Sequence, residues 1–359
     1  GQVISLQPQT VYPNEQWARS YNNQPPQVRT DVLIVEYSAH PDALFHLPGG
    51  QTVAVDALQS PVEPQAASIQ SRLTPVAAAT QRVRLRVIEK ATGKPVGVFG
   101  VSTDPVSGIG AGREAEGGTL EAIRAKAARL PPTHLPAGLR YIIDRAAFFF
   151  CRDTISRDYL KAQGVKTPLL EFGPDAQLGM HLRDDARGFA WLKAHGLEDG
   201  KFICVIPRLR YTPYYRVRNI PRVPADDIRD AINNRTTESD HARLREMIVA
   251  YVKNTGNKVM ACAEMTYQVE MAREVLVDPL PEAIRKHVVW RDSYWLPDEA
   301  ASVYSRALAV VSVECHSPLI AYANGTPAFY VRQPTDTCKG QMYRDFGAGE
   351  WFFEIEETS

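Results

Sequence analysis

The stretch AVVSVECHSPLIAYANGTPAFYVR, residues 309–332, decides the fold that this sequence predicts. Residues 309–313 are apolar and largely β-branched, which is typical of a parallel strand buried on both faces. Pro318 suits the first turn of a short helix, and Ser317 is its expected cap. Gly325 is expected just past the end of that helix, before a second buried strand. The pattern therefore predicts a strand–helix–strand unit of an open α/β sheet.

His316 lies where the first of these strands gives way to the helix. Open α/β sheets bind ligands outside the carboxyl ends of their strands, and the N–H groups at a helix N-terminus favour anions. His316 is therefore a candidate catalytic residue. A histidine in this position can also serve only to satisfy hydrogen bonds at a strand end, so this residue alone does not decide between the two interpretations.

Length and composition limit the classes of protein that fit. The 359 residues, 44% of them hydrophobic, are enough for two domains. A formal net charge of zero argues against a nucleic-acid-binding protein, and no apolar run approaches the roughly 20 residues of a membrane helix. The five cysteines are widely spaced and form no CxxC or Cys/His pattern, so we expect no metal site and a reducing compartment.

Strand and helix patterns alternate in two sets, one before and one after about residue 183. This predicts an α/β protein of two Rossmann-like domains with parallel sheets, residues 1–183 and 184–359, and a ligand in the central cleft between them. Residues 1–30, rich in Pro, Gln and Asn, are expected to form an irregular arm. Residues 80–91 fit an amphipathic helix but also alternate like a strand.

A long loop with many arginines and tyrosines is expected at residues 208–238, before a helix at 241–255. A loop of this length inside a compact domain indicates function. Tyr211 and Tyr214 are candidates for stacking on sugar rings, and Arg216 for binding acidic sugars or lipid phosphates. An ordinary surface loop is the alternative.

Cationic residues follow several of the predicted strands. Arg208 and Arg210 come directly after the strand at residues 202–207, and Lys339 lies in a polar loop near the C-terminus. Because the carboxyl ends of parallel strands open on one edge, these side chains and His316 are expected to face one pocket. Arginine binds carboxylate or phosphate with two parallel hydrogen bonds, so the sequence predicts an anion site. Separate, solvated charges are the alternative for each residue.

Residues 90–353 resemble the polysaccharide pyruvyl transferases. The matching segments are GKPVGVFG at 93–100 and CRDTISRDYLKAQGV at 151–165, the counterpart of the family's Arg-Asp-x-x-Ser segment. The strongest match is the His-Ser…Gly-x-Pro block within residues 312–327. The order and spacing of these segments carry the resemblance.

The resemblance implies a GT-B-like fold, with the acceptor on the side of residues 1–183 and the donor on the side of 184–359. The family moves the enolpyruvyl unit of phosphoenolpyruvate onto two sugar hydroxyls and forms a pyruvate ketal, with no metal or nucleotide. It implies His316 as the general acid/base, because the enol carbon must gain a proton while a hydroxyl attacks. The implied donor-binding residues are Arg208, Arg210, Ser317 and Lys339.

Position 314 departs from the family pattern, which usually has arginine two residues before the histidine. Glu314 stands there instead. We expect Glu314 either to pair with Arg208 or to bind sugar hydroxyls of the acceptor together with Tyr211, Tyr214 and Arg216.

The leading hypothesis is a bacterial pyruvyl transferase of exopolysaccharide biosynthesis in the cell envelope, whose acceptor is a glycan or a lipid-linked oligosaccharide. Two alternatives stay open: a GT-B glycosyltransferase that uses a nucleotide sugar, and a non-catalytic glycan-binding relative. A cytoplasmic location is expected, with peripheral contact to a membrane left open. Because the sequence starts at Gly1, a removed signal peptide is left open as well. Oligomeric state is not predicted.

Overall fold

The computed structural model describes residues 96–105 and 118–357 together with the backbone of four strands nearer the N-terminus. These are β1 (Val32–Ala39), β2 (Leu44–His46), β3 (Thr52–Ala54) and β4 (Gln81–Ile88). β1 pairs antiparallel with β4, and β2 with β3. The alternating residues near position 80 therefore form a strand and not a helix, whereas the expected arm at residues 1–30 lies outside the described residues.

Contacts within the chain divide it into two compact units, Gly1–Gly97 and Val98–Ser359. The second unit contains both parallel sheets described below and all the site residues predicted from the sequence. The boundary expected near residue 183 stays a prediction.

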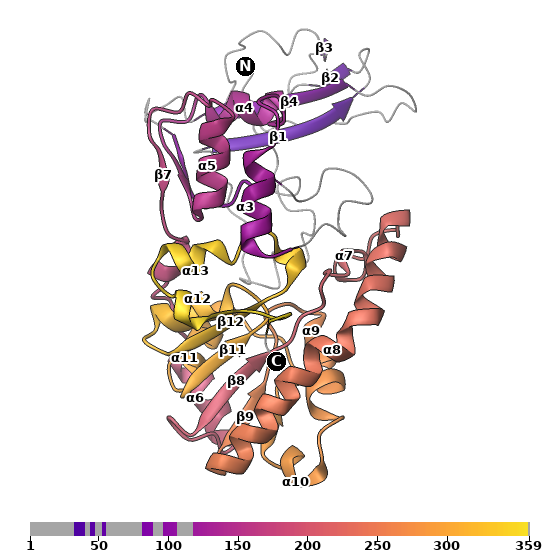
Figure 1. Ribbon diagram of the computed structural model, residues 1–359, viewed down its shortest axis with the longest axis vertical. Helices are drawn as coiled ribbons and strands as arrows, with labels where there is room; N and C mark the ends of the chain where they lie inside the picture. The colour runs from indigo at the N-terminus through magenta and orange to yellow at the C-terminus, as the bar shows by residue number, and fades with distance from the viewer. Residues whose placement is uncertain are drawn as a thin grey trace. The chain divides into compact units, whose positions relative to one another are not determined.

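The larger sheet has six parallel strands in the order β10-β9-β8-β11-β12-β13 (Figure 1). Its chain order, 3-2-1-4-5-6, is that of a doubly wound sheet, and it reverses between β8 and β11. Ligands bind at such a reversal, so the fold itself places a candidate site between these two strands. The strands are β8 (Phe202–Ile206), β9 (Lys258–Ala261), β10 (Val288–Trp290), β11 (Ala309–Ser312), β12 (Ala328–Arg332) and β13 (Phe352–Glu354).

A smaller parallel sheet has the order β5-β6-β7. Its strands are β5 (Val98–Val101), β6 (Phe149–Cys151) and β7 (Leu170–Phe172). With it go α3 (Leu120–Ala128), α4 (Ala137–Ile143) and α5 (Thr154–Ala162). The predicted α/β class with parallel sheets is confirmed.

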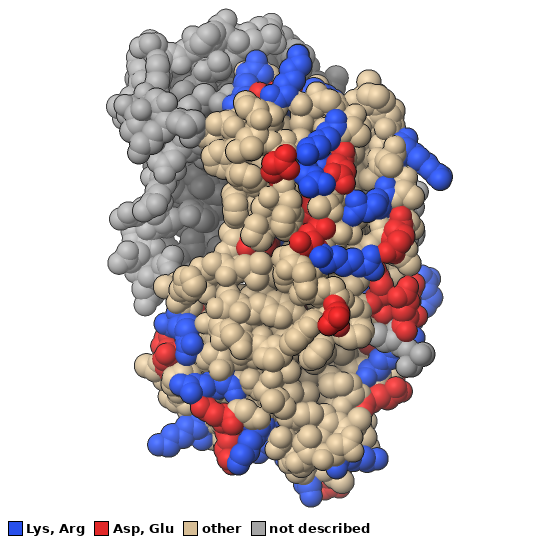
Figure 2. All heavy atoms as spheres, turned by 60° about the vertical axis from the view of Figure 1, so that its left-hand side comes forward, with Lys and Arg blue, Asp and Glu red and all other residues tan. Residues whose placement is uncertain are grey.

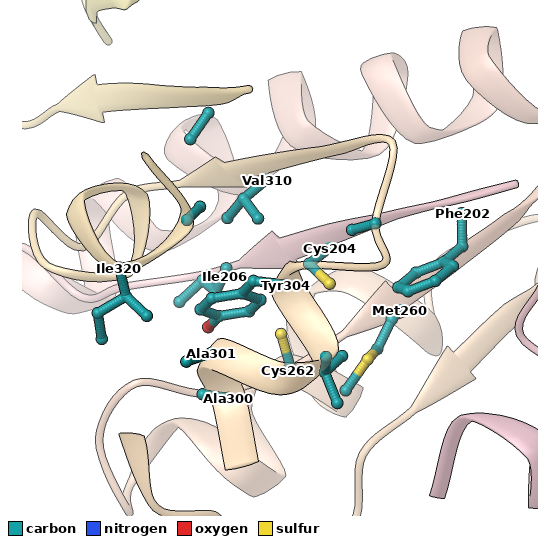
Figure 3. Packing of buried hydrophobic residues seen from close by; sticks show 14 of the residues in the cluster. Phe202, Cys204, Ile206, Met260, Cys262, Ala300, Ala301, Tyr304, Val310 and Ile320 are labelled. Atoms are coloured by element: carbon teal, nitrogen blue, oxygen red, sulfur yellow. The ribbon is translucent and has the colours of Figure 1, made fainter. Parts of the chain in front are cut away.

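Helices cover both faces of the six-stranded sheet (Figure 1). On one face α6 (Asp185–Ala194), α11 (Pro297–Tyr304) and α12 (Ser317–Ala323) pack against β8 and its neighbours. Figure 3 shows this core, in which Tyr304 and Ile320 meet residues of the strands. The other face is covered by α8 (Pro224–Thr255), α9 (Gln268–Ala272), a π-helical turn (Arg273–Val277) and α10 (Glu282–Arg285). The remaining helices are α7 (Tyr214–Val217) and α13 (Gln341–Asp345).

The five cysteines are all buried and unpaired. Cys204 on β8 and Cys262 just after β9 lie in the core that Figure 3 shows. Buried free cysteines act as small hydrophobic residues, as the sequence predicted.

The prediction of a long loop at residues 208–238 is wrong for its second half, because α8 begins at Pro224 and runs for 32 residues. Pro224 occupies the first turn, and the Asp226 carboxylate accepts a hydrogen bond from the backbone N–H of Val223 at 2.9 Å. The apolar pattern misses this half of the helix because it does not pack on the sheet. The residues of α8 that join the core come later, at Leu244, Ile248 and Val252.

No helix in the described part of the chain, α8 included, is long and apolar enough to cross a membrane. On the face drawn in Figure 2, lysine and arginine are interspersed with aspartate and glutamate, and neither sign forms a large patch. An anion site is therefore to be sought among the partly buried charges at the sheet edge and not on this surface.

Candidate functional site

The predicted site residues meet at the carboxyl edge of the six-stranded sheet. Arg208 follows β8 by two residues, and Glu314 and His316 follow β11. Glu264 follows β9 at the same edge. These strands are neighbours and parallel, so their loops lie side by side at the point where the strand order reverses.

Arg208 is buried between two carboxylates. Its Nε lies 3.2 Å from Oε2 of Glu314, and its Nη1 forms an ion pair with Oδ1 of Asp336. Glu314 also accepts a hydrogen bond from Nε2 of Gln268 at 2.6 Å. Asp336 accepts one from the hydroxyl of Tyr330 at 2.7 Å. The guanidinium charge of Arg208 is therefore matched within the protein.

The two carboxylates around Arg208 titrate in opposite directions. Burial raises the pKa of Glu314 to about 7, and Arg208 offsets this only in part. Burial also acts to raise the pKa of Asp336, but Arg208 and Lys339 overcome it and lower that pKa to about 2. Asp336 is thus the permanent counter-charge, whereas Glu314 can change its protonation near neutral pH.

Lys339 lies beside the same cluster, with Nζ 3.6 Å from Oδ1 of Asp336. About a third of its side chain is exposed. Asp336 and the sulfur of Cys315 raise the pKa of Lys339 against the larger opposing effect of burial. Lys339 therefore presents a positive charge that reaches solvent.

His316 is held by Glu264. Nδ1 of His316 lies 3.1 Å from Oε1 of Glu264, so this nitrogen carries a proton that faces a carboxylate. The neighbouring sulfur of Cys315 and the Glu264 carboxylate raise the pKa of His316 well above its usual value, against the effect of burial. Hydrogen bonds from His316 and Ser317 in turn hold the pKa of Glu264 below its usual value although burial opposes them. This pair favours a charged imidazole whose orientation is fixed.

The same carboxylate caps α12. Oε2 of Glu264 accepts hydrogen bonds from the backbone N–H and the hydroxyl of Ser317, at 2.7 and 2.8 Å. The expected cap role of Ser317 is therefore wrong, since Ser317 is the first residue of the helix and His316 precedes it as the cap position. A carboxylate supplied by the loop after β9 satisfies the free N–H and suits the positive end of the helix.

A residue of the smaller sheet joins the site. Arg152 follows β6, and its Nη1 lies 3.2 Å from Nε2 of His316 and 2.6 Å from Oδ2 of Asp175. Its Nε donates to the hydroxyl of Ser102 at 2.9 Å. The next residue, Asp153, caps α5 and accepts a hydrogen bond from the backbone N–H of Ser156 at 2.7 Å.

The other four predicted site residues lie before α7 or on it. Arg210 and Tyr211 come before α7, and Tyr214 and Arg216 are part of it. Arg210 is paired with Asp240 at 2.8 and 2.9 Å. The backbone N–H of Tyr211 donates to Asn233 at 2.9 Å. The ring of Tyr214 lies under the guanidinium of Arg218, and Arg216 donates to the Tyr215 hydroxyl at 2.9 Å.

Among the described residues, the hydrogen bonds and the ion pair of His316 are made with Arg152 and Glu264, and not with these four candidates. Arg210 is linked to Arg208 only indirectly, because Gln333 donates to both Asp240 and the Arg208 carbonyl at 3.1 Å. Their expected roles in donor and acceptor binding stay predictions.

Sequence reasoning missed Glu264 and Asp336 and assigned Arg152 no role in the site. The signal for Glu264 was present, since an acid directly after an apolar strand lies at the same edge as Arg208 and His316. Arg152 also follows a strand, but nothing in the sequence shows that the two sheets turn these strand ends toward each other.

Comparison with known proteins gives one broad match. Residues 13–333 match the family model described as polysaccharide pyruvyl transferase. No curated protein matches the chain.

Two solved structures are weakly similar. One is UDP-N-acetylglucosamine 2-epimerase from Rickettsia bellii, 12% identical over 54% of this chain and 44% of that chain, with a TM-score of 0.33. The other is POFUT1 in complex with GDP, 13% identical over 49% of this chain and 58% of that chain, with a TM-score of 0.24.

Proposed function

The chain belongs to the polysaccharide pyruvyl transferase family, and on this basis we propose that it transfers the pyruvyl group of phosphoenolpyruvate to a sugar of a polysaccharide. The observation that best supports this is the placement of His316 between Glu264 and Arg152, at the edge of the sheet where the strand order reverses.

The reaction replaces the enol phosphate by a ketal. One sugar hydroxyl adds to C2 of phosphoenolpyruvate and gives its proton to an oxygen of the phosphate group, while C3 gains a proton from an acid of the site. A second hydroxyl then displaces the phosphate at C2, and its proton leaves with the phosphate or with a base of the site. The two C–O bonds formed replace the C=C π bond and the C–O bond to phosphate, so the reaction needs no oxidant or reductant.

His316 suits the proton transfers of this reaction. As a charged imidazole held by Glu264, it can give the proton on Nε2 to C3 in the first step. The neutral ring that remains can accept a hydrogen bond at Nε2 from Arg152 and take the proton of the second hydroxyl. The fixed orientation of the ring shortens the search for a reactive geometry.

Positive charge near His316 suits an anionic donor. Lys339, with about a third of its side chain exposed, lies beside the cluster, and donor binding by Lys339 is part of the proposal. Ser317 is less suited to this expected role, because its backbone N–H and its hydroxyl are both donated to Glu264. Arg208 is expected to act mainly as the buried counter-charge of Glu314 and Asp336. A lysine ammonium binds phosphate as a point charge, so it does not need the geometry of an arginine fork.

The acceptor is proposed to be a glycan or lipid-linked oligosaccharide of bacterial exopolysaccharide or cell-envelope synthesis, handled in the cytoplasm or at the membrane surface. Tyr214 and Arg216, both exposed on α7, remain candidates for contact with this acceptor. Glu314, buried against Arg208, is better placed for a structural and electrostatic role than for sugar binding.

The test is an assay of the purified chain with phosphoenolpyruvate and a panel of envelope oligosaccharides, following phosphate release and the mass of the product. A gain of one pyruvyl ketal with release of one phosphate supports the proposal. His316→Asn is expected to abolish product while leaving thermal unfolding unchanged, whereas His181→Asn, at an exposed position, should retain activity.

Product from a UDP- or GDP-sugar, with none from phosphoenolpyruvate, would overturn the proposal in favour of a glycosyltransferase. Binding of oligosaccharide without binding of either donor would indicate a glycan-binding relative.

A further inference from the structure

The segment that joins α7 to α8 carries large apolar side chains on its surface. Four of them are 45% to 52% exposed, namely Tyr214, Ile220, Val223 and Ile228. Tyr214 belongs to α7, Ile228 lies early in α8, and the other two lie in the connection between these helices. In Figure 1 the first half of α8 extends past α9, with α7 beside it. We call this region, residues 214–235, the α7–α8 tip.

The α7–α8 tip is polar where it is buried and apolar where it is exposed. In the first half of α8 the buried residues are Asp226 and Asn233. Asn233 forms two hydrogen bonds of 2.9 Å with the backbone of Tyr211, and Asp226 accepts one from the N–H of Val223 at 2.9 Å. A helix that packs only on its own protein has the opposite arrangement, with its apolar side turned inward. The exposed apolar side therefore indicates a contact with a second apolar environment.

Unpaired arginines accompany these apolar side chains. The α7–α8 tip contains five arginines, three aspartates and no lysine or glutamate, which gives it a formal charge of +2 in a chain whose net charge is zero. The aspartates are paired with Arg222 and Arg229. Three further arginines are exposed, and in the part of the chain that the structure describes none of them forms an ion pair with a carboxylate: Arg216, Arg218 and Arg235. Their positive charge can therefore meet an anionic partner.

An anionic lipid surface fits this combination of side chains. Aliphatic side chains insert at the boundary between the lipid headgroups and the acyl chains. Arginines bind the lipid phosphates there while their carbon stems stay in the apolar layer. A tyrosine, with an apolar ring and a polar end, suits the same depth. All three kinds of side chain are present in the α7–α8 tip.

Other partners fit the α7–α8 tip less well. Sugars stack on open aromatic rings, but three of the four apolar side chains are aliphatic, and the guanidinium of Arg218 lies 4.6 Å over the ring of Tyr214. A folded protein would have to place carboxylates opposite each of the unpaired arginines. A fluid lipid surface meets both the charges and the apolar side chains without a matching shape.

We propose that the α7–α8 tip docks the protein on a membrane surface that contains anionic lipids. Ile220, Val223 and Ile228 enter the headgroup boundary, and the unpaired arginines bind lipid phosphates. The inference goes beyond the proposed function and does not depend on it, because docking needs neither phosphoenolpyruvate nor His316. For the proposed transferase, docking brings the site close to acceptors that are held at the same surface.

Co-sedimentation of the full chain with lipid vesicles tests this inference. One kind of vesicle is made of phosphatidylcholine alone, and the other contains about one third of the anionic lipid phosphatidylglycerol. The wild type is expected to bind only the anionic vesicles. Its affinity should fall as the salt concentration rises, because salt screens the attraction between the arginines and the lipid phosphates.

Two double variants separate the apolar and the charged parts of the contact. Ile220→Ser combined with Ile228→Ser should weaken binding about 10- to 100-fold, because it removes apolar surface that inserts into the lipid. Arg218→Gln combined with Arg235→Gln should weaken binding about fivefold for each arginine removed. It should also make the binding less dependent on salt.

Matched controls change the same kinds of residue elsewhere on the surface. Leu308→Ser replaces a leucine that is 46% exposed. Arg129→Gln replaces an exposed arginine that has no acidic partner among the residues described. Both controls should bind vesicles like the wild type. Thermal unfolding of every variant shows whether a loss of binding reflects a loss of fold.

Three results overturn the inference: no binding of the wild type to either kind of vesicle, equal binding to both kinds, or wild-type affinity in either double variant. If vesicles are not bound and the isoleucine double variant turns a dimeric wild type into a monomer, the α7–α8 tip is instead a contact between two copies. Loss of oligosaccharide binding in that variant, again without vesicle binding, would identify a glycan site.

The inference and the proposed function fail separately. Pyruvyl transfer to a free oligosaccharide, without any vesicle binding, would remove the inference and leave the proposed function standing. Vesicle binding that depends on the α7–α8 tip, without pyruvyl transfer, would do the opposite.

Discussion

Glu264 links His316 to the start of α12 with a single carboxylate. Oε1 lies 3.1 Å from Nδ1 of His316, while Oε2 accepts from the backbone N–H of the next residue at 2.7 Å. Rotation of the imidazole would break its hydrogen bond to a carboxylate that the start of the helix itself holds in place. A side chain from the loop after β9 therefore sets the orientation of a residue that follows β11.

Replacing Glu264 by Gln is expected to lower kcat by roughly 10- to 100-fold. This is only part of the rate enhancement that a general acid contributes, because His316 itself is retained. The carboxylate favours the charged form of His316, so its loss lowers the pKa of His316. Activity that needs the charged imidazole is lost as the pH rises through that pKa, and the falling limb of the pH profile of kcat should move to lower pH. Glu270→Gln, on the exposed side of α9, is the control. An unmoved limb would show that Glu264 has only a structural role.

Replacing Glu314 by Gln is expected to stabilise the protein at high pH only. Burial raises the pKa of Glu314 to about 7, from the 4.5 of an unperturbed glutamate. Between these values the folded state holds a proton that the unfolded chain has lost, so the contribution of Glu314 to stability falls as the pH rises. The groups that face it are Arg208, Glu264, Asp336 and Lys339.

Thermal unfolding across pH tests this. The melting temperature of Glu314→Gln should equal that of the wild type at about pH 5 and exceed it at about pH 8. Glu282→Gln, at an exposed position on α10, should show no such trend. A difference in melting temperature between Glu314→Gln and the wild type that stays constant over this pH range would mean that Glu314 is charged throughout.

Asp336→Asn is expected to destabilise the fold by roughly 3–5 kcal/mol, the cost of breaking a buried ion pair. The carboxylate is the main counter-charge of buried Arg208 and accepts from Tyr330. Its pKa is lowered to about 2, so in the wild type this stabilisation is present above the unperturbed value of 3.8 and is lost only as the pH falls toward 2. Urea unfolding gives the free energy. Asp199→Asn, which breaks an exposed pair with Arg306, should cost about 1 kcal/mol or less, and an equal cost for both would contradict the prediction.

Gly340→Ala is expected to cost about 1–3 kcal/mol by overpacking. A Cβ at this position would lie 2.6 Å from Cδ of buried Arg332 and would also press on the ring of Phe352. Arg332 cannot move away, because Glu354 holds its Nη1 at 2.6 Å. Gly349→Ala is the control, since the nearest atom to its Cβ would be 3.8 Å away, and similar melting temperatures for the two variants would refute the packing argument.

The larger sheet could be predicted closely from the sequence because its strands are continuous apolar runs. β8 and β11 end one residue before the predicted ends, and Arg208 and His316 follow them as expected. Gly325 has a φ of +79° just past α12, which fits the residue expected there. Local patterns were sufficient wherever an element is buried on both faces.

The rest depended on contacts between distant residues. Glu264 and His316 are 52 residues apart, and Arg152 and His316 are 164 apart. No spacing rule joins residues from different strands and sheets. The start of α8 was missed for a different reason, since the buried residues between 224 and 238 are polar and the segment lacks the apolar stripe by which a helix is recognised.

Balanced charge at the sheet edge has a consequence for the speed of ligand capture. Four groups that can be positive stand against four carboxylates, so the cluster exerts little attraction beyond contact range. An incoming anion is then not guided over long distances, and its association rate should change little with ionic strength. The groups are Arg152, Arg208, His316 and Lys339, with Asp175, Glu264, Glu314 and Asp336.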